Sequence, residues 1–139
     1  MAYWLMKTEP EEFSWDDQVK RGQKGEPWTG VRNFAARKHL KAMKEGERAF
    51  FYHTGDEKQV VGIIEIIKEA YPDKTDEKGV FVCVDTRAVE PFAEPVTLAT
   101  IKADTKLKSM VLAREPRLSV QPVTAEEWKT ICRMGGAKP

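Results

Sequence analysis

The stretch from Gln59 to Lys68 constrains the fold more than any other part of the sequence. Its apolar residues occupy both alternating faces of an extended chain: Val61, Ile63, Ile64, Ile66 and Ile67. β-Branched residues at this density favour a strand, and apolar residues on both faces require cover from both sides. The sequence therefore predicts a central strand of a sheet, with other layers packed against both of its faces.

Shorter apolar segments around this strand predict the remaining elements. Further strands are expected at Tyr3–Thr8, Glu47–His53, Val80–Arg87 and Leu118–Val123. Helices are expected after the cap Ser14, over Arg32–Lys44, and over Ala125–Met134 behind a Thr124/Glu127 capping box. Pro91 and Pro95 are expected to break the chain before a helical turn at Leu98–Lys102. This pattern predicts an α+β fold, a small, mostly antiparallel β-barrel with peripheral helices.

Size and composition are those of one soluble domain. The 139 residues are expected to form a single unit, residues 1–139, with 41% hydrophobic and 32% charged residues. No apolar run reaches the roughly 18 residues that cross a bilayer, and the first residues lack the pattern of a secretion signal. We therefore expect a cytoplasmic protein that has no membrane partner.

Net charge does not by itself point to nucleic acid, because 23 basic residues face 22 acidic ones. The distribution is less even. Six basic residues oppose two acidic ones between Arg32 and Arg48, and five oppose two between Ile101 and Arg117. An acidic segment, Glu9 to Asp17, balances them. The basic segments either face solvent or form part of a positively charged surface that binds a polyanion.

Motifs for catalysis are not found in the sequence. His39 and His53 are the only histidines, and no serine lies in a nucleophile-elbow pattern. The glycines form neither a P-loop nor a dinucleotide fingerprint. Cys83 and Cys132 make no zinc site and are expected in the core. His39 is expected to face solvent, and His53 to be a hydrogen-bonded structural residue. We expect a binding protein that uses no metal and no cofactor.

One of the four tryptophans stands apart from the others. Trp4, Trp15 and Trp128 fall in predicted strands or helices and are expected to be packed, whereas Trp28 follows a Gly/Pro-rich loop. An indole in such a place can stack on a nucleobase. The following Arg32 and Asn33 offer hydrogen bonds to a base edge or a phosphate, and Tyr52 and His53 are candidates for a second wall.

Four segments, in order, resemble the EVE domain family. They are YWLMKTEP at 3–10, WTGVRNFAAR at 28–37, GERAFFYHTG at 46–55 running on to EAYPD at 69–73, and RLSVQPV at 117–123. The resemblance spans nearly the whole sequence. It implies a PUA-like fold related to YTH-type readers of methylated adenine, and recognition of a modified base in DNA, extruded into an aromatic pocket.

The resemblance also implies positions for the site. The base pocket would gather Lys7, Ser14, Trp28, Arg32, Asn33, Tyr52 and His53. Phosphates would be met by Lys106, Lys108, Arg114 and Arg117. Two residues depart from the family pattern, Phe81 in a predicted strand and Pro116 beside the proposed phosphate-facing edge.

Two alternatives to a reader of modified DNA remain open at this stage. One is a PUA-like RNA-binding module that reads modified tRNA or rRNA, for which the basic stretch Lys102 to Arg117 could follow an RNA backbone. The other is an enzyme that acts on a nucleobase-like ligand through His53.

Overall fold

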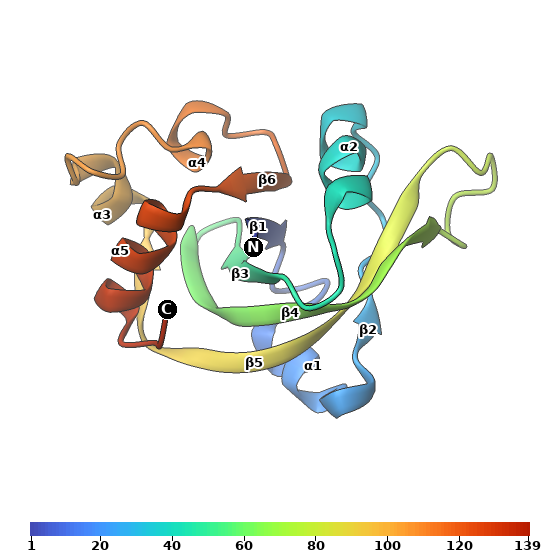
Figure 1. Cartoon of the computed structure of the whole chain (residues 1–139), viewed down its shortest axis with the longest axis horizontal. Helices are drawn as coiled ribbons and strands as arrows, with labels where there is room; N and C mark the ends of the chain where they lie inside the picture. The colour runs from blue at the N-terminus through green and yellow to red at the C-terminus, as the bar shows by residue number, and fades with distance from the viewer.

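A curved sheet of six strands organises the molecule, whose computed structural model covers residues 1–139 (Figure 1). The strands are β1 (Tyr3–Thr8), β2 (Glu26–Pro27), β3 (Arg48–His53), β4 (Gln59–Pro72), β5 (Val82–Thr97) and β6 (Val120–Val123). Their order across the sheet is β2-β5-β4-β3-β1-β6. β1 and β3 are parallel, and every other neighbouring pair is antiparallel.

Five α-helices and one short 3₁₀ turn surround this sheet. The helices are α1 (Trp15–Lys20), α2 (Phe34–Ala42), α3 (Leu98–Ala103), α4 (Val111–Arg114) and α5 (Ala125–Gly135), and the 3₁₀ turn, η1, spans Gly22–Lys24. The predicted α+β, PUA-like class is confirmed. The barrel is not closed, because the end strands β2 and β6 do not pair. None of the helices has both the length and the apolar character needed to cross a lipid bilayer.

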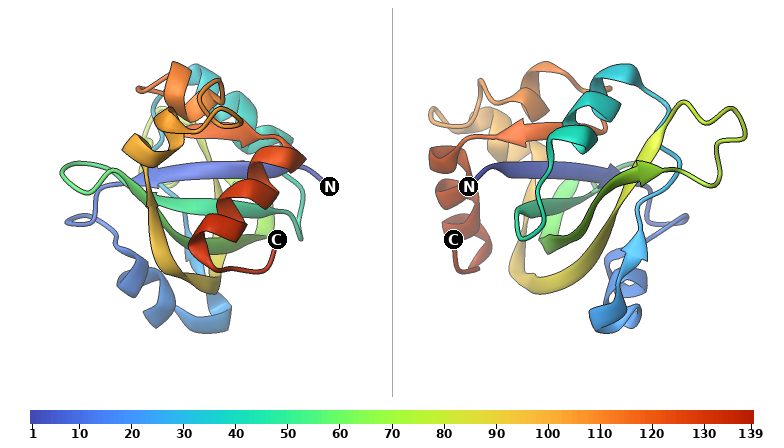
Figure 2. Two further views of the ribbon diagram at one scale, coloured as in Figure 1. Left: turned by 90° about the vertical axis from the view of Figure 1, so that its left-hand side faces the viewer. Right: turned by 45° about the vertical axis from the view of Figure 1, so that its right-hand side comes forward.

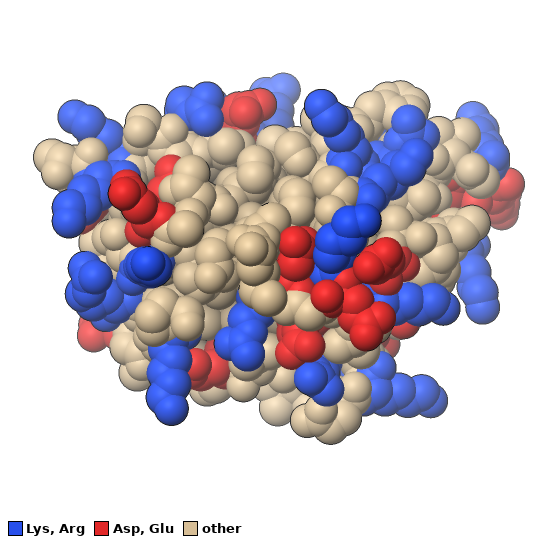
Figure 3. Space-filling view, viewed as in Figure 1, with Lys and Arg blue, Asp and Glu red and all other residues tan.

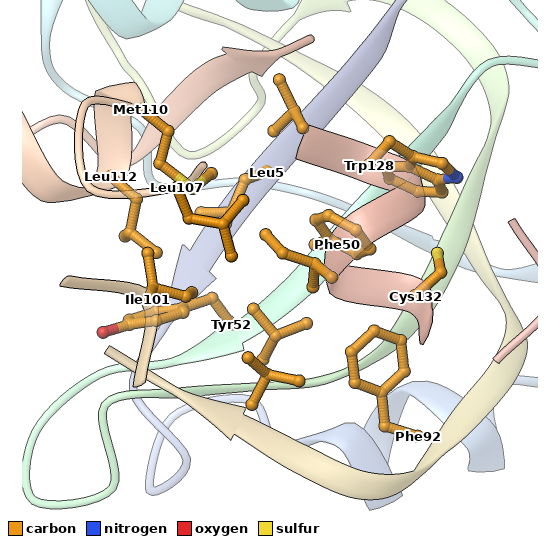
Figure 4. Close-up of a cluster of buried hydrophobic side chains, with 14 of the residues drawn as sticks. Leu5, Phe50, Tyr52, Phe92, Ile101, Leu107, Met110, Leu112, Trp128 and Cys132 are labelled. Carbon is orange, nitrogen blue, oxygen red and sulfur yellow. The ribbon is translucent and has the colours of Figure 1, made fainter. Parts of the chain in front are cut away.

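Residues of β4 contribute to two hydrophobic cores, one on each face of the sheet. Ile63 packs with Leu5, Phe50 and Trp128 in a core covered by α3, α4 and α5 (Figure 4). Ile64 and Ile66 instead face Met6, Phe51 and Leu40, a core closed by α2 and the segment before it. The prediction of a central strand covered on both faces is confirmed.

Side-chain caps fix the N-terminal ends of α1, α2 and α5. Ser14 and Thr124 each form the full capping box, with Asp17 and Glu127 as the reciprocal partners. Asn33 caps α2 by accepting a hydrogen bond from the Ala36 N–H at 2.9 Å. The expected start of this helix at Arg32 was therefore two residues early, because an N-cap residue keeps extended backbone angles.

The expected break at Pro91 and Pro95 was wrong, since β5 continues through both prolines. β2 pairs only with Thr86 and Asp85, so the later part of β5 has β4 on one side and no strand on the other. A proline lacks a backbone N–H, but on this open side of β5 no strand needs that N–H as a hydrogen-bond donor. His39 also differs from its expected place in solvent: it is half-buried, with its ring 5.9 Å from that of Trp4.

Candidate nucleic-acid interface

A cavity of about 670 Å³ opens beside the carboxyl end of β1 and is called the main cavity below. Figure 2 (left) shows β1 running from the N-terminus toward the side of the molecule where the β3–β4 turn and the segment after β1 project. Four segments distant in sequence meet there. The lining consists of residues 7–9, 12–13, 21, 26–32, 54, 116–117 and 119. The volume is in the range of ligand sites, and the lining is mostly polar.

Trp28 lines the main cavity and is held in place by its neighbours. Only 7% of the residue is exposed, and its indole lies edge-on to Phe51 at 5.5 Å and to Phe13 at 6.2 Å. The Trp28 N–H donates to the Val84 carbonyl at 2.7 Å, which ties the segment to β5. Because both backbone and ring are held, Trp28 is positioned before any ligand arrives.

The segment after Trp28 is clamped by a buried carboxylate. Asp73, 2% exposed, accepts hydrogen bonds from the Gly30 N–H at 2.9 Å and from Arg32 at 3.1 Å. Gly30 has a φ of 86°, a conformation that favours glycine. Burial alone would raise the pKa of Asp73, but hydrogen bonds from Thr75, Gly30 and Arg32 together lower it. The charged carboxylate therefore fixes the rim of the cavity.

Lys7 lies between the main cavity and a neighbouring hollow. Its Nζ donates to the Pro116 carbonyl at 2.9 Å and lies 5.8 Å from the centre of the Tyr52 ring. Burial lowers the pKa of this ammonium. An ammonium carries three donors, so Lys7 keeps hydrogen-bonding capacity toward a ligand.

Charges of both signs line the main cavity. Four basic side chains, Lys7, Arg21, Arg32 and Arg117, face three acidic ones, Glu9, Glu12 and Glu26. Arg21 and Glu26 neutralise each other in an ion pair of 2.9 Å. The face of the molecule in Figure 3 likewise carries basic and acidic side chains side by side. The main cavity thus offers both donors and acceptors, as a base edge requires.

Sequence comparison places the protein in a known family. The sequence profile of the EVE domain matches residues 2–134. The chain belongs to the EVE family. Human thymocyte nuclear protein 1 is 34% identical to this EVE domain, over 99% of the chain and 76% of the human protein.

Solved structures of related proteins have the same fold. An NMR structure of a Rhodopseudomonas palustris protein is 59% identical to this EVE domain and superposes with a TM-score of 0.92, covering 98% of this chain and 94% of the other. Human THYN1, in a crystal structure with DNA that contains 5-methylcytosine, is 35% identical with a TM-score of 0.89, and the match covers 100% of both chains.

Four of the predicted site residues of this EVE domain meet at the main cavity: Lys7, Trp28, Arg32 and Arg117. Two others are helix caps. Ser14 caps α1 and does not line the cavity. Asn33 uses its side-chain oxygen to cap α2 and lines a separate hollow of about 280 Å³, which borders the main cavity at Pro116 and Arg117.

Tyr52 and His53 do not form a common second wall. Neighbouring residues of a strand point to opposite faces of the sheet. Tyr52 enters the core beside Leu5, while His53 lies on the other face against Phe51, at 5.6 Å. His53 is 7% exposed. Its Nε2 lies 3.0 Å from the backbone nitrogen of Trp15, and its Nδ1 lies 2.8 Å from Glu57 Oε1.

The predicted phosphate contacts are also dispersed. Arg117 lines the main cavity, but Lys106, Lys108 and Arg114 line neither it nor the two smaller hollows beside it. Lys106 and Lys108 are exposed in the connection between α3 and α4. Arg114 donates to the Ser109 carbonyl at 2.6 Å. Sequence spacing could not reveal this, because it does not show how the connection between α3 and α4 lies relative to the cavity.

Sequence reasoning missed most of the cavity lining, including Glu9, Glu12, Phe13 and Thr54, and it also missed the clamping residue Asp73. Phe13 directly precedes the cap of α1, where an apolar residue has a known packing role, and this was an available signal. Asp73 lay within the recognised motif at 69–73 but had no predicted role. Nothing local marked Thr54.

The two departures from the family pattern differ in their distance from the site. Phe81 packs on Phe34 at 5.1 Å and lines none of the three hollows. Phe34 itself is 62% exposed. Pro116, in contrast, borders all three hollows and accepts the Lys7 hydrogen bond through its carbonyl.

Proposed function

We propose that this EVE domain binds DNA that carries a modified base, with 5-methylcytosine or a close derivative as the preferred base. The observation that carries the proposal is the structural match, over the whole of both chains, to human THYN1 in complex with DNA containing 5-methylcytosine. The main cavity supports it with a preformed tryptophan wall and with donors and acceptors for a base edge.

In the proposed mode, the modified base leaves the duplex and enters the main cavity beside Trp28. Extrusion costs a few kcal/mol of stacking, and contact with an aromatic wall and edge hydrogen bonds offset it. Glu9 and Glu12 supply acceptors for the amino group of cytosine, the pairing that carboxylates make with this base. Lys7 and Arg117 supply donors for its carbonyl and for the sugar–phosphate.

We propose binding without catalysis. The support is the state of His53, the one histidine close to the site. Its Nε2 accepts from the Trp15 N–H, so the ring proton is on Nδ1 and directed at Glu57. A general base needs a nitrogen within reach of a bound ligand, and both nitrogens of His53 are already engaged inside the protein.

Replacement of Trp28 by phenylalanine tests the proposal. Wild type is expected to bind a duplex with 5-methylcytosine more tightly than the unmodified duplex. Trp28→Phe is expected to weaken binding of the methylated duplex by about fivefold, near the lower end of base-stacking energies. Fluorescence anisotropy with methylated, hydroxymethylated and unmodified duplexes, and with RNA of the same sequence, measures this.

Trp15→Phe is the matched control. The Trp15 indole packs edge-on to the same Phe51, at 5.4 Å, but does not line the main cavity. It is expected to lower thermal stability and to leave the affinity for methylated DNA unchanged. Equal binding of all duplexes by wild type, or tighter binding of the RNA, would refute the proposed function.

A further inference from the structure

A second hollow lies next to the main cavity and has a different charge. It measures about 260 Å³ and lies between the β3–β4 turn, α3 and the end of α4; we call it the lysine hollow. Three of its lining residues are lysines, Lys7, Lys58 and Lys102, and none is acidic. In the main cavity, by comparison, three glutamates offset most of the charge of four basic residues. An anion is therefore attracted more strongly in the lysine hollow than in the main cavity.

We propose that the lysine hollow binds a backbone phosphate of the DNA strand whose base occupies the main cavity. This inference rests on the proposed function and adds a separate site to it. Base contacts carry sequence or modification preference, whereas phosphate contacts position the strand and add affinity that depends on salt. Two adjoining cavities, one with side chains of both charges and one with basic side chains only, are suited to this division.

The ammonium groups of the hollow are free of acidic partners. The four ion pairs of the molecule involve none of Lys7, Lys58 and Lys102. The carboxylate of Glu57, next to Lys58 in sequence, is already bonded to His53 at 2.8 Å and to Gln59 at 3.2 Å. A phosphate would therefore not have to displace an existing carboxylate.

The turn that carries Lys58 is held in an uncommon backbone conformation. Lys58 is the only residue other than glycine with a positive φ, 46°. Its carbonyl accepts a hydrogen bond from the Leu98 N–H at 2.8 Å, at the start of α3. This bond ties the turn of Lys58 to the helix of Lys102, so both lysines border the same hollow.

Tyr52 adds a neutral donor to the three lysines. Its ring lies in the core beside Ile101, and its hydroxyl points away from the other labelled side chains (Figure 4). Burial raises the pKa of Tyr52 to about 12, so the hydroxyl keeps its proton at neutral pH. A protonated hydroxyl can donate to a phosphate oxygen.

The two sites are continuous. Lys7, Thr54 and Pro116 line both the main cavity and the lysine hollow. Lys7 in particular lies at the boundary, with its Nζ bonded to the Pro116 carbonyl. A strand that sends a base into the first site therefore passes the second.

The test compares two double variants with the same loss of charge. Lys58→Gln/Lys102→Gln removes the exposed lysines of the hollow, and Lys106→Gln/Lys108→Gln removes two exposed lysines nearby that line none of the three hollows. Affinity for methylated and unmodified duplexes is measured by anisotropy at several salt concentrations, and thermal melting verifies folding.

The hollow variant is expected to bind both duplexes roughly tenfold more weakly and to lose about one unit of the slope of log K against log salt, as expected for one phosphate contact. Its preference for the methylated duplex should equal that of wild type, and the control variant should keep the slope. Equal losses in both variants, or no loss in the hollow variant, would overturn the phosphate site alone. Absence of any methyl preference in wild type would instead refute the proposed function.

Discussion

At the scale of single residues, His53 shows how a polar side chain beside a site can serve the fold. Its Nε2 accepts a hydrogen bond from the backbone N–H of Trp15, and its Nδ1 contacts Glu57. Trp15 in turn fills the space over Gly62, where an added Cβ would meet the indole at 2.6 Å. The histidine therefore holds the start of α1 against the sheet.

Replacement of His53 by alanine separates a structural from a functional role. His53→Ala leaves the Trp15 N–H without its acceptor, so we expect a loss of about 1–3 kcal/mol in the free energy of unfolding, measured by urea denaturation. DNA affinity should stay within about twofold of wild type, a difference of roughly 0.4 kcal/mol. Unchanged stability together with lost binding would contradict this and would favour a direct role for His53 in the site.

At the scale of elements, Ser14 illustrates the same distinction for a helix. It was predicted to join the base pocket, but its hydroxyl accepts the Asp17 N–H at 3.1 Å and caps α1. We expect Ser14→Ala to lower the free energy of unfolding by about 1 kcal/mol. Ser14→Asp keeps an acceptor at the cap and should retain most of the stability. In thermal and urea unfolding, equal effects of the two substitutions would show that capping is not what Ser14 contributes.

Local signals explain which elements were predictable. The Ser14 cap of α1, the capping box of α5 and the two-faced apolar pattern of β4 depend on residues close in sequence, and all three predictions were confirmed. The extent of β5 was not predictable in this way. Whether Pro91 breaks a strand depends on whether a second strand pairs with β5 on the side away from β4, and that is decided by the extent of β2.

The site shows the same limit at the scale of the whole molecule. Family resemblance led to Lys7, Trp28, Arg32 and Arg117, which come from three distant segments and meet at the main cavity. The other predicted site residues do not line this cavity, and side-chain direction separates several of them. Tyr52 and His53 lie on opposite faces, and the exposed lysines between α3 and α4 lie outside the three hollows.

Two buried carboxylates connect distant parts of the molecule and tie its stability to pH. Asp73 joins the β4–β5 connection to the rim at Gly30 and Arg32. Glu47 accepts from Trp4 Nε1 at 2.9 Å and from the Lys44 and Ala2 N–H groups. Burial alone would raise the pKa of each carboxyl, but the hydrogen bonds that Asp73 and Glu47 accept lower both pKa values below their ordinary range.

These lowered pKa values predict a loss of stability in acid. As the pH falls below about 5, the unfolded chain takes up protons before the folded one, so the free energy of unfolding decreases until the folded carboxyls are also protonated. Asp73→Asn should lower stability at neutral pH and flatten its decline between about pH 5 and 2. Urea unfolding across this range, with the exposed-turn substitution Asp56→Asn as control, measures both effects. If Asp73→Asn declined as steeply as wild type, other carboxylates would have to carry the acid dependence.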